Sequence, residues 1–269
     1  MYPHLLFEFC ILLALAVIGS IAILPYSLRL LSESKKKKPI KMSPKALLLL
    51  SVLQNAVVFA IVIGIGLYVG HQIGLGTRLI DEVISGGSMQ QIIIIIFTAC
   101  ICGIIGGVLL MLLDLLFLPH FPEKLLTTAL KTTQWENFTA SFYGGINEEL
   151  FMRLFGVSLV AWIMSRILHM TNGLSTTADF WIAIIIMAVL FAIGHLPTLK
   201  NLLGTITPVM FLRSMLLNTP IGLLCGWIFW HYGIEAAIIT HFVVDIIYHV
   251  GGTYVVRSKY AKFSDKSSI

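Results

Sequence analysis

The chain has 269 residues, of which 58% are hydrophobic and only 12% are charged, and its mean hydropathy is +0.93. A soluble domain carries about 25% charged residues, so this composition excludes an ordinary soluble protein. It indicates an integral membrane protein, organised as a single domain over residues 1–269. The net charge of +5 does not indicate nucleic-acid binding, because the basic residues cluster in connections between apolar stretches.

Seven apolar stretches approach the roughly 20 residues that a membrane-spanning helix needs. We therefore predict an all-α, polytopic bundle of about seven transmembrane helices. The first stretch has no basic residue before it and no clear cleavage site, so we expect a retained span rather than a signal peptide. Pro197 is expected to end or kink the fifth. The predicted spans are Leu5–Leu24, Ala46–Val69, Ile92–Leu118, Gly144–Leu168, Phe180–Leu196, Val209–Trp230 and Gly233–Val256.

The distribution of lysine and arginine predicts the orientation of these spans. Fourteen of these residues fall in connections on one side or in the tail after the seventh span, whereas only Arg78 and Arg166 fall on the other side. Arg153 and Arg213 lie within predicted spans. Because basic residues favour the cytoplasm, we expect an external N-terminus and a cytoplasmic C-terminus.

Three other segments carry separate expectations. Thr127–Ser141 mixes apolar and polar residues and is predicted to form an amphipathic helix at the membrane interface. The run Lys35–Lys38 is interpreted as a topology signal, with contact to anionic lipid as the alternative. The polar tail Arg257–Ile269 is expected to be flexible.

The four cysteines all lie in apolar stretches. The Cys-Ile-Cys sequence at Cys100 and Cys102 lacks the spacing of a zinc knuckle or of a thioredoxin-like motif. We expect four free, buried cysteines that serve packing: Cys10, Cys100, Cys102 and Cys225.

Two adjacent glutamates, Glu148 and Glu149, lie in the fourth span with Arg153 close behind. Ionisable groups inside a membrane helix are costly and usually mark a functional site. Glu149 and Arg153 are four residues apart and share a helix face, which predicts an ion pair between them. Glu148 points about 100° away from Glu149, so it is the candidate general base. The alternative is an ion-pair network that only fixes helix packing.

Histidines in two later spans complete the set of candidate site residues. His195 lies at the end of the fifth span, four residues after Phe191, and considered alone it indicates an interfacial histidine. His241 and Asp245 share a face of the seventh span, and His249 continues that face. Such groups can stabilise an oxyanion, bind a metal or relay protons, or they can simply satisfy each other. A helix rises about 1.5 Å per residue, so the predicted spans place Glu148, His195 and Asp245 within roughly 15 Å of one another in depth across the membrane.

In this order and on successive membrane helices, the residues resemble the pattern of the CPBP intramembrane proteases. That family includes type II CAAX prenyl proteases and bacteriocin-processing or immunity proteins. The resemblance covers residues 144–249, less than half of the chain, and the first three spans carry no recognised motif. The motifs are Glu-Glu-x-x-x-Arg, Phe-x-x-x-His and His-x-x-x-Asp/Asn, which here are Glu148, Glu149 and Arg153, then Phe191 and His195, then His241 and Asp245.

The resemblance implies a role for each of these residues. Glu148, with His195, would activate a water molecule for attack on a peptide carbonyl, and His241 and Asp245 would stabilise the oxyanion. Glu149 and Arg153 would support them. Asp245 stands where the prenyl proteases usually carry asparagine. Since an ionised aspartate cannot donate a hydrogen bond, Asp245 is expected either to be protonated or to orient His241.

The resemblance thus implies an intramembrane endopeptidase of the glutamate type that needs no cofactor. Its expected partners are the lipid bilayer and a membrane-anchored substrate, either a CAAX-type protein, a bacteriocin leader or a signalling protein. Its active site is expected near the cytoplasmic face. A zinc site at Glu148, His195, His241 and Asp245 is the alternative for the chemistry.

Other intramembrane chemistries fit the sequence less well. It contains neither His-Glu-x-x-His nor Gly-x-Gly-Asp, and Ser88 lies in a predicted loop, which disfavours a rhomboid-like serine site. Two functions of other classes remain alternatives: a non-proteolytic scaffold or immunity protein, and a proton-coupled transporter. The sequence shows no repeated half of the kind common among transporters.

Overall fold

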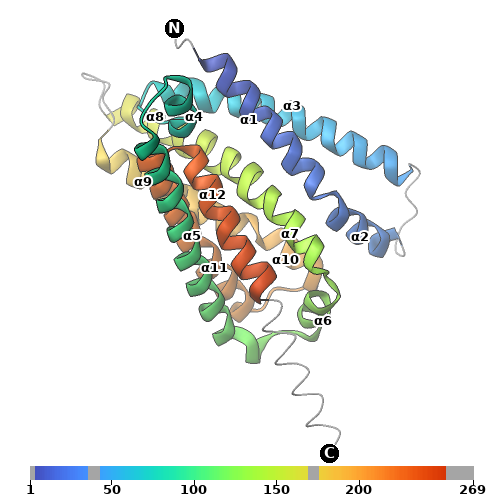
Figure 1. Cartoon of the computed structure of the whole chain (residues 1–269). Helices are drawn as coiled ribbons and strands as arrows, with labels where there is room; N and C mark the ends of the chain where they lie inside the picture. Colours follow the sequence, from blue (N-terminus) through green and yellow to red (C-terminus); the bar gives the residue numbers. More distant parts are fainter. Residues whose placement is uncertain (1–3, 36–42, 169–175, 253–269) are drawn as a thin grey trace, which may run out of the picture.

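The computed structural model describes residues 4–35, 43–168 and 176–252, and within these ranges the chain folds into helices with no strand (Figure 1). The predicted all-α class is confirmed. A single helix satisfies its backbone N–H and C=O groups within one segment, as the bilayer interior requires. In chain order the helices are α1 (Leu5–Ala22), α2 (Leu24–Lys35), α3 (Pro44–His71), α4 (Arg78–Ile84), α5 (Met89–Phe117), the 3-10 turn η1 (Leu118–His120), α6 (Glu123–Lys131), α7 (Gln134–Phe142), the π-helices η2 (Tyr143–Glu148) and η3 (Leu150–Val157), α8 (Ser158–Leu168), α9 (Thr177–Gly194), α10 (Leu196–Leu203), α11 (Pro208–Tyr232), α12 (Ile234–Asp245) and the π-helix η4 (Ile246–Gly251).

Seven helical stretches of the described residues are long and apolar enough to cross a membrane, in agreement with the predicted number. The protein is therefore an integral, multi-pass membrane protein. The end predicted for the seventh span, Val256, lies outside the described residues. The candidate spans are Leu5–Arg29, Lys45–His71, Met89–His120, Gln134–Ile167, Thr177–Leu203, Pro208–Tyr232 and Ile234–Gly251.

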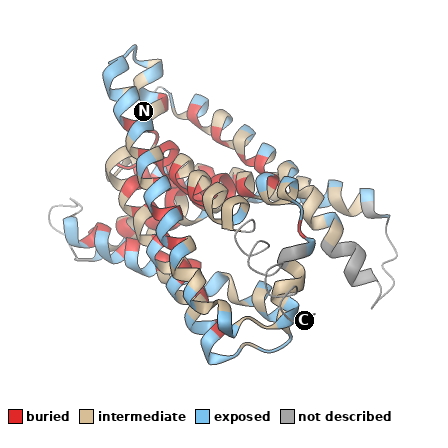
Figure 2. Cartoon of the chain, turned by 60° about the horizontal axis from the view of Figure 1, so that its bottom comes forward, coloured by how far each residue is buried: buried red, intermediate tan, exposed pale blue. Residues whose placement is uncertain are grey.

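The helices form a bundle in which the fourth span lies between two groups (Figure 1). Helices α1 and α3 pack on each other on one flank, and both contact the π-helical part of the fourth span. On the other side α5 packs on α12, and α9 packs on α11. Apolar side chains remain exposed on the outer faces, for example Leu49, Ile61 and Phe97, whereas buried residues concentrate inside (Figure 2). Outward apolar faces are expected where lipid is the solvent.

Glycines allow the closest helix contacts in the bundle. A Cβ added at Gly103 of α5 would lie 2.7 Å from the Cβ of Val243 and 2.8 Å from the carbonyl oxygen of Thr240, both on α12. Gly222 of α11 is in a similar position against the backbone of Ala188 on α9. Small residues at such crossings let membrane helices pack at short range by van der Waals contact.

We expect Gly103→Val to destabilise the protein by about 1–3 kcal/mol, because the new side chain overpacks the α5–α12 contact. Thermal unfolding in detergent would measure the change. Ile104→Val, on the exposed face of the same helix, provides the control and should have little effect. Equal stability of the two variants would show that the α5–α12 spacing does not depend on this glycine.

The fourth span begins earlier than the sequence analysis predicted, and the segment Thr127–Ser141 is not a single helix. That segment is divided between α6 and α7, and α7 continues directly into η2. The break is a capping box, in which the Thr133 hydroxyl accepts from the Glu136 N–H and the Glu136 carboxylate accepts from the Thr133 N–H. The Thr-x-x-Glu signature was present in the sequence and marks a helix start at this position.

The prediction for Pro197 is confirmed. Helix α9 ends at Gly194, His195 lies at the junction, and α10 begins at Leu196 with the proline in its first turn. Proline is tolerated there because the first helical N–H groups have no partner within the helix. The fifth span therefore continues through α10, and His195 lies at a bend inside it rather than at its end.

All four cysteines are free, as predicted, but only Cys225 is buried. Cys10 is exposed, and Cys100 and Cys102 are partly exposed. The expectation of burial was wrong for these three because an apolar face of a membrane helix can contact lipid instead of protein.

Candidate active site

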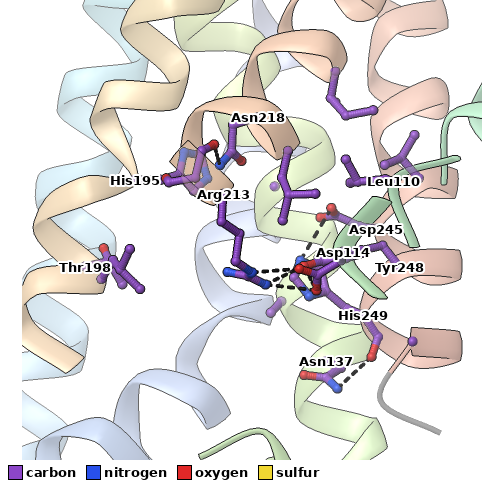
Figure 3. Close-up of a pocket in the computed structure, with 18 of the residues that line it drawn as sticks. Leu110, Asp114, Asn137, His195, Thr198, Arg213, Asn218, Asp245, Tyr248 and His249 are labelled. Carbon is purple, nitrogen blue, oxygen red and sulfur yellow. Dashed lines mark hydrogen bonds and ion pairs between the residues drawn. The ribbon is translucent and has the colours of Figure 1, made fainter. Parts of the chain in front are cut away.

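A cavity of about 470 Å³ lies between the helices and collects most of the predicted site residues. Glu148, His195, His241 and Asp245 all line it, and Phe191 does so as well. They come from η2, the α9–α10 junction and α12, which are far apart in the sequence. His195 and Asp245 lie on opposite sides of the cavity in Figure 3. The cavity thus brings together the four residues that the sequence singled out for chemistry.

The two adjacent glutamates have different environments. Glu149 is fully buried, and its Oε1 lies 2.8 Å from Nη1 of Arg153, which forms the predicted ion pair. The same Oε1 accepts a hydrogen bond of 2.6 Å from Nδ1 of His241. The Arg153 guanidinium also donates to the carbonyl of Gly222 and lies 4.8 Å from the centre of the Phe191 ring. Glu149 therefore belongs to a network that joins three spans to the fourth.

Glu148 lies on the cavity side of the same helix and is only partly buried. Among the described residues its carboxylate forms neither a hydrogen bond nor an ion pair. Both carboxylate oxygens are therefore available to a water molecule or a substrate in the cavity. This separation of roles follows from the 100° rotation between neighbouring residues of a helix.

His195 is held by the backbone of the preceding turn. Its Nδ1 lies 2.8 Å from the carbonyl oxygen of Phe191, and its ring packs edge-on against the Phe191 ring at 4.7 Å. Because a carbonyl only accepts, Nδ1 carries the proton in this contact. A neutral His195 would then have Nε2 as a hydrogen-bond acceptor.

His241 is oriented by Glu149 rather than by Asp245. Its Nδ1 donates to Glu149, while its Nε2 lies 3.7 Å from Oδ1 of Asp245. That distance is too long for a hydrogen bond, so a self-satisfied His241–Asp245 pair does not form. Nε2 of His249, which is half-exposed at the edge of the cavity, is also 3.7 Å from Asp245. Asp245 therefore lies between two imidazoles.

The glutamates lie farther from the start of their helix than the predicted span implied. Their helix begins at Gln134, so at about 1.5 Å per residue Glu148 is roughly 20 Å along it. The predicted span Gly144–Leu168 puts Glu148 only four residues after its first residue. The error has the same cause as the early start of the span, the capping box at Thr133.

Local backbone features bring Glu148 close to α12. The residues around it adopt the wider π-helical turn, a geometry that is rare and frequently found at functional sites. A Cβ added at Gly144 would lie 2.5 Å from Oδ2 of Asp245, and one at Gly145 would lie 2.9 Å from the Cβ of Phe242. The two glycines thus allow η2 to approach the His241–Asp245 face closely.

Asn147, the residue before the glutamates, gives the first span a structural role that the sequence analysis missed. It is buried, and its Nδ2 donates to the carbonyl of Ala16 at 3.0 Å and to Oγ of Ser20 at 3.1 Å. A Cβ at Gly19 would collide with its Oδ1. Asn55 of α3 donates to the same serine at 3.4 Å. Helix α1 is therefore anchored directly beside Glu148.

Asn147→Ala should destabilise the protein by about 1–2 kcal/mol, since two hydrogen bonds between spans are lost. Thermal unfolding in detergent would measure this loss. Asn55→Ala is the matched control, because it removes one longer contact to the same serine. An Asn147→Ala protein as stable as the Asn55→Ala protein would contradict the assigned role.

A second polar cluster in the cavity was also missed by the sequence analysis. From the sequence, Arg213 is identified only as a basic residue within a span, and Asp114 is not identified. In the structure Arg213 of α11 forms a two-point ion pair with Asp114 of α5, at 2.6 and 2.9 Å, and Tyr248 of η4 contacts both (Figure 3). A charged residue alone in a span usually has a buried partner, which was the available signal.

Of the four residues proposed for zinc, only His241 belongs to a close group of possible metal ligands among the described residues. In the part of the chain that the structure describes, the three-residue group with donor atoms within 4.8 Å of one another is Glu149, Cys225 and His241. It contains only one of the four residues proposed for zinc. Its Glu149 and His241 atoms already share a hydrogen bond, and Arg153 lies beside them. A divalent cation there would break that bond next to a buried guanidinium, so we derive no step through a metal.

Comparison with known protein families gives a match over the part of the chain that carries the candidate site residues. The family described as "Type II CAAX prenyl endopeptidase Rce1-like" matches residues 131–247. The predicted family resemblance is confirmed. The match includes Glu148, Glu149, Arg153, His195, His241 and Asp245, and it begins after the first three spans. No curated protein and no solved structure gives a significant match to this chain.

Proposed function

We propose that this protein is an intramembrane endopeptidase in which Glu148 and His195 activate water for hydrolysis of a peptide bond. The Rce1-like match supports a protease and points to a CAAX-type, membrane-associated substrate. The observation that carries the proposal is the difference between the two glutamates. Glu149 is neutralised by Arg153 and His241, while Glu148 has no protein partner among the described residues and lines a cavity with His195, His241 and Asp245.

The proposed reaction begins with a water molecule between Glu148 and Nε2 of His195. Glu148 takes a proton from the water as the oxygen attacks the carbonyl carbon of the substrate. The negative charge that develops on the carbonyl oxygen is stabilised by a proton on Nε2 of His241. Glu148 then gives its proton to the nitrogen of the scissile bond, and that bond breaks to release an amine and a carboxylic acid.

Glu149 and Asp245 support His241 in this proposal. Glu149 fixes the ring through Nδ1, which leaves Nε2 directed toward Asp245 and the cavity. An ionised Asp245 cannot donate to the oxyanion, so its proposed role is to compensate the positive charge of a doubly protonated His241. This role accounts for an aspartate at a position where the prenyl proteases usually carry asparagine.

We further propose that the site opens toward the cytoplasm. The cavity is lined by α6, α10 and residues at the α1–α2 junction, at the end of the bundle where the basic connections begin (Figure 1). Basic connections favour the cytoplasmic side. The N-terminus would then be external, and a substrate anchored in the inner leaflet would reach the cavity. A bacteriocin leader or a membrane-bound signalling protein would meet the same requirement.

The test is a cleavage assay in proteoliposomes with a farnesylated CAAX peptide and, in parallel, a membrane-anchored signalling or leader peptide. Cleavage by the wild type that persists with a chelator and is lost in His195→Ala would support the proposal. Folded wild-type protein that cuts none of these substrates would favour the scaffold or immunity function. Proton-coupled uptake without cleavage would favour a transporter.

A further inference from the structure

The Arg213 side chain is fixed along one edge only. Its Nε donates to Oδ1 of Asp114 at 2.6 Å, and its Nη2 donates to Oδ2 of Asp114 at 2.9 Å and to the Tyr248 hydroxyl at 3.0 Å. The Phe121 ring lies 4.8 Å from the guanidinium carbon. Asp114 and Tyr248 come from α5 and η4, so three helices determine the position of this one group.

Two N–H groups of the Arg213 guanidinium remain available for a ligand. A guanidinium has five N–H groups, and the contacts to Asp114 and Tyr248 use the one on Nε and the two on Nη2. The two N–H groups of Nη1 have no partner among the described residues. The Arg213 side chain is 13% exposed and lines the same cavity as Glu148. Nη1 is therefore an unbonded donor on a fixed side chain that lines the space in which the substrate is proposed to bind.

The charge of the cluster limits the kind of ligand it can hold. Asp114 already receives three hydrogen bonds, two from Arg213 and one from Tyr248 at 2.9 Å, and it balances the arginine charge. The other basic residues that line the cavity are the three histidines His195, His241 and His249. A phosphate dianion would need more positive charge than this pair provides. A single carboxylate, accepting from Nη1, matches the donors that are left.

We propose that Nη1 of Arg213 binds the free α-carboxylate at the C-terminus of the substrate, which makes Arg213 a specificity-determining residue. The inference rests on the proposed function and extends it. Because Arg213 is fixed in the cavity, it sets how many substrate residues lie between the bound C-terminus and the peptide bond that is placed at Glu148. The enzyme then cuts close to a chain end and not within a continuous segment. The cavity also has apolar lining residues such as Leu110, Leu217 and Ile221. These suit uncharged side chains on the substrate residues between the C-terminus and the scissile bond.

The experiment compares two farnesylated CAAX peptides in proteoliposomes, identical except that one ends in a carboxylate and the other in a carboxamide. The wild type should cleave the carboxylate peptide with a kcat/KM about tenfold or more above that of the carboxamide peptide, since a charge-assisted hydrogen bond is lost. The double variant Arg213→Gln with Asp114→Asn should reduce this ratio to about one. The double change is used because removing Arg213 alone would leave Asp114 uncompensated.

Two further variants make the test decisive. Arg213→Met with Asp114→Leu removes the same charges at similar volume, and it replaces the first pair if that pair does not fold. Arg166→Gln changes an arginine that contacts Gln72, away from the cavity, and should keep the wild-type ratio. Equal cleavage of both peptides by the wild type, or an unchanged ratio in a folded double variant, overturns the inference and leaves the protease proposal standing. Failure of the wild type to cleave either peptide overturns the inference, and the protease proposal falls with it only if the signalling and leader peptides also remain uncut.

Discussion

Glu148→Gln is expected to lower the cleavage rate by about 10²–10⁴-fold, the usual contribution of a positioned general base. Glutamine keeps the size of the side chain but cannot take a proton from water. The Glu148 carboxylate has no protein partner among the described residues, so the change should leave the folded state almost unaffected. Cleavage of a farnesylated CAAX peptide and thermal unfolding of the same preparation would measure the two effects separately.

Glu123→Gln provides the control for this substitution, because Glu123 is exposed at the start of α6 and is outside the cavity. Its activity and stability should match those of the wild type. A Glu148→Gln protein that retains wild-type cleavage would exclude Glu148 as the base. Loss of folding in this variant would instead indicate that Glu148 has a structural role like that of Glu149.

Glu149→Gln is expected to destabilise the protein by about 3–5 kcal/mol, because it leaves the Arg153 guanidinium charged and buried without its anionic partner. Arg153 is 1% exposed, so water cannot replace the lost contact. His241 also loses the ionised acceptor of its 2.6 Å hydrogen bond. Thermal unfolding in detergent, or unfolding by titration with a denaturing detergent, would measure this loss.

A double variant tests whether the loss of stability comes from an uncompensated buried charge or only from lost packing. Glu149→Gln combined with Arg153→Met removes both charges and should restore part of the stability, since an apolar replacement of a buried pair is often well tolerated. If Glu149→Gln alone is as stable as the wild type, the network is not needed for folding. Substitution of Glu148 is thus expected to reduce catalysis, whereas substitution of the adjacent Glu149 is expected to reduce stability.

Much of the membrane architecture follows from local sequence. A run of about 20 apolar residues must form a helix to satisfy its backbone in lipid. The number of spans was therefore predicted correctly, and the clearest differences in their bounds are the start of the fourth span and the end of the fifth. The Glu149–Arg153 pair and the different direction of Glu148 also follow from helix periodicity. The bend at His195 follows from Pro197. All of these features depend on residues that are close together in the chain.

The contacts between spans were not available from the sequence. Helix periodicity places His241 and Asp245 on one face, and the sequence suggested that they might pair. In the structure His241 instead bonds to Glu149, 92 residues earlier. Asn147 bonds to α1, and Arg213 bonds to Asp114. Each pairing depends on which helices become neighbours and how closely they approach, and glycines such as Gly19, Gly144 and Gly145 set that distance.

The sequence by itself therefore determined the class of protein, its spans and the residue types able to perform the chemistry, because these depend on composition and on the 3.6-residue period of a helix. Only the tertiary structure decided that Glu148 faces a shared cavity without a protein partner while Glu149 is buried between Arg153 and His241. It also decided that Arg213 lines that cavity and that, among the described residues, its Nη1 forms no hydrogen bond. Such distinctions arise from packing between distant segments, which no local pattern encodes.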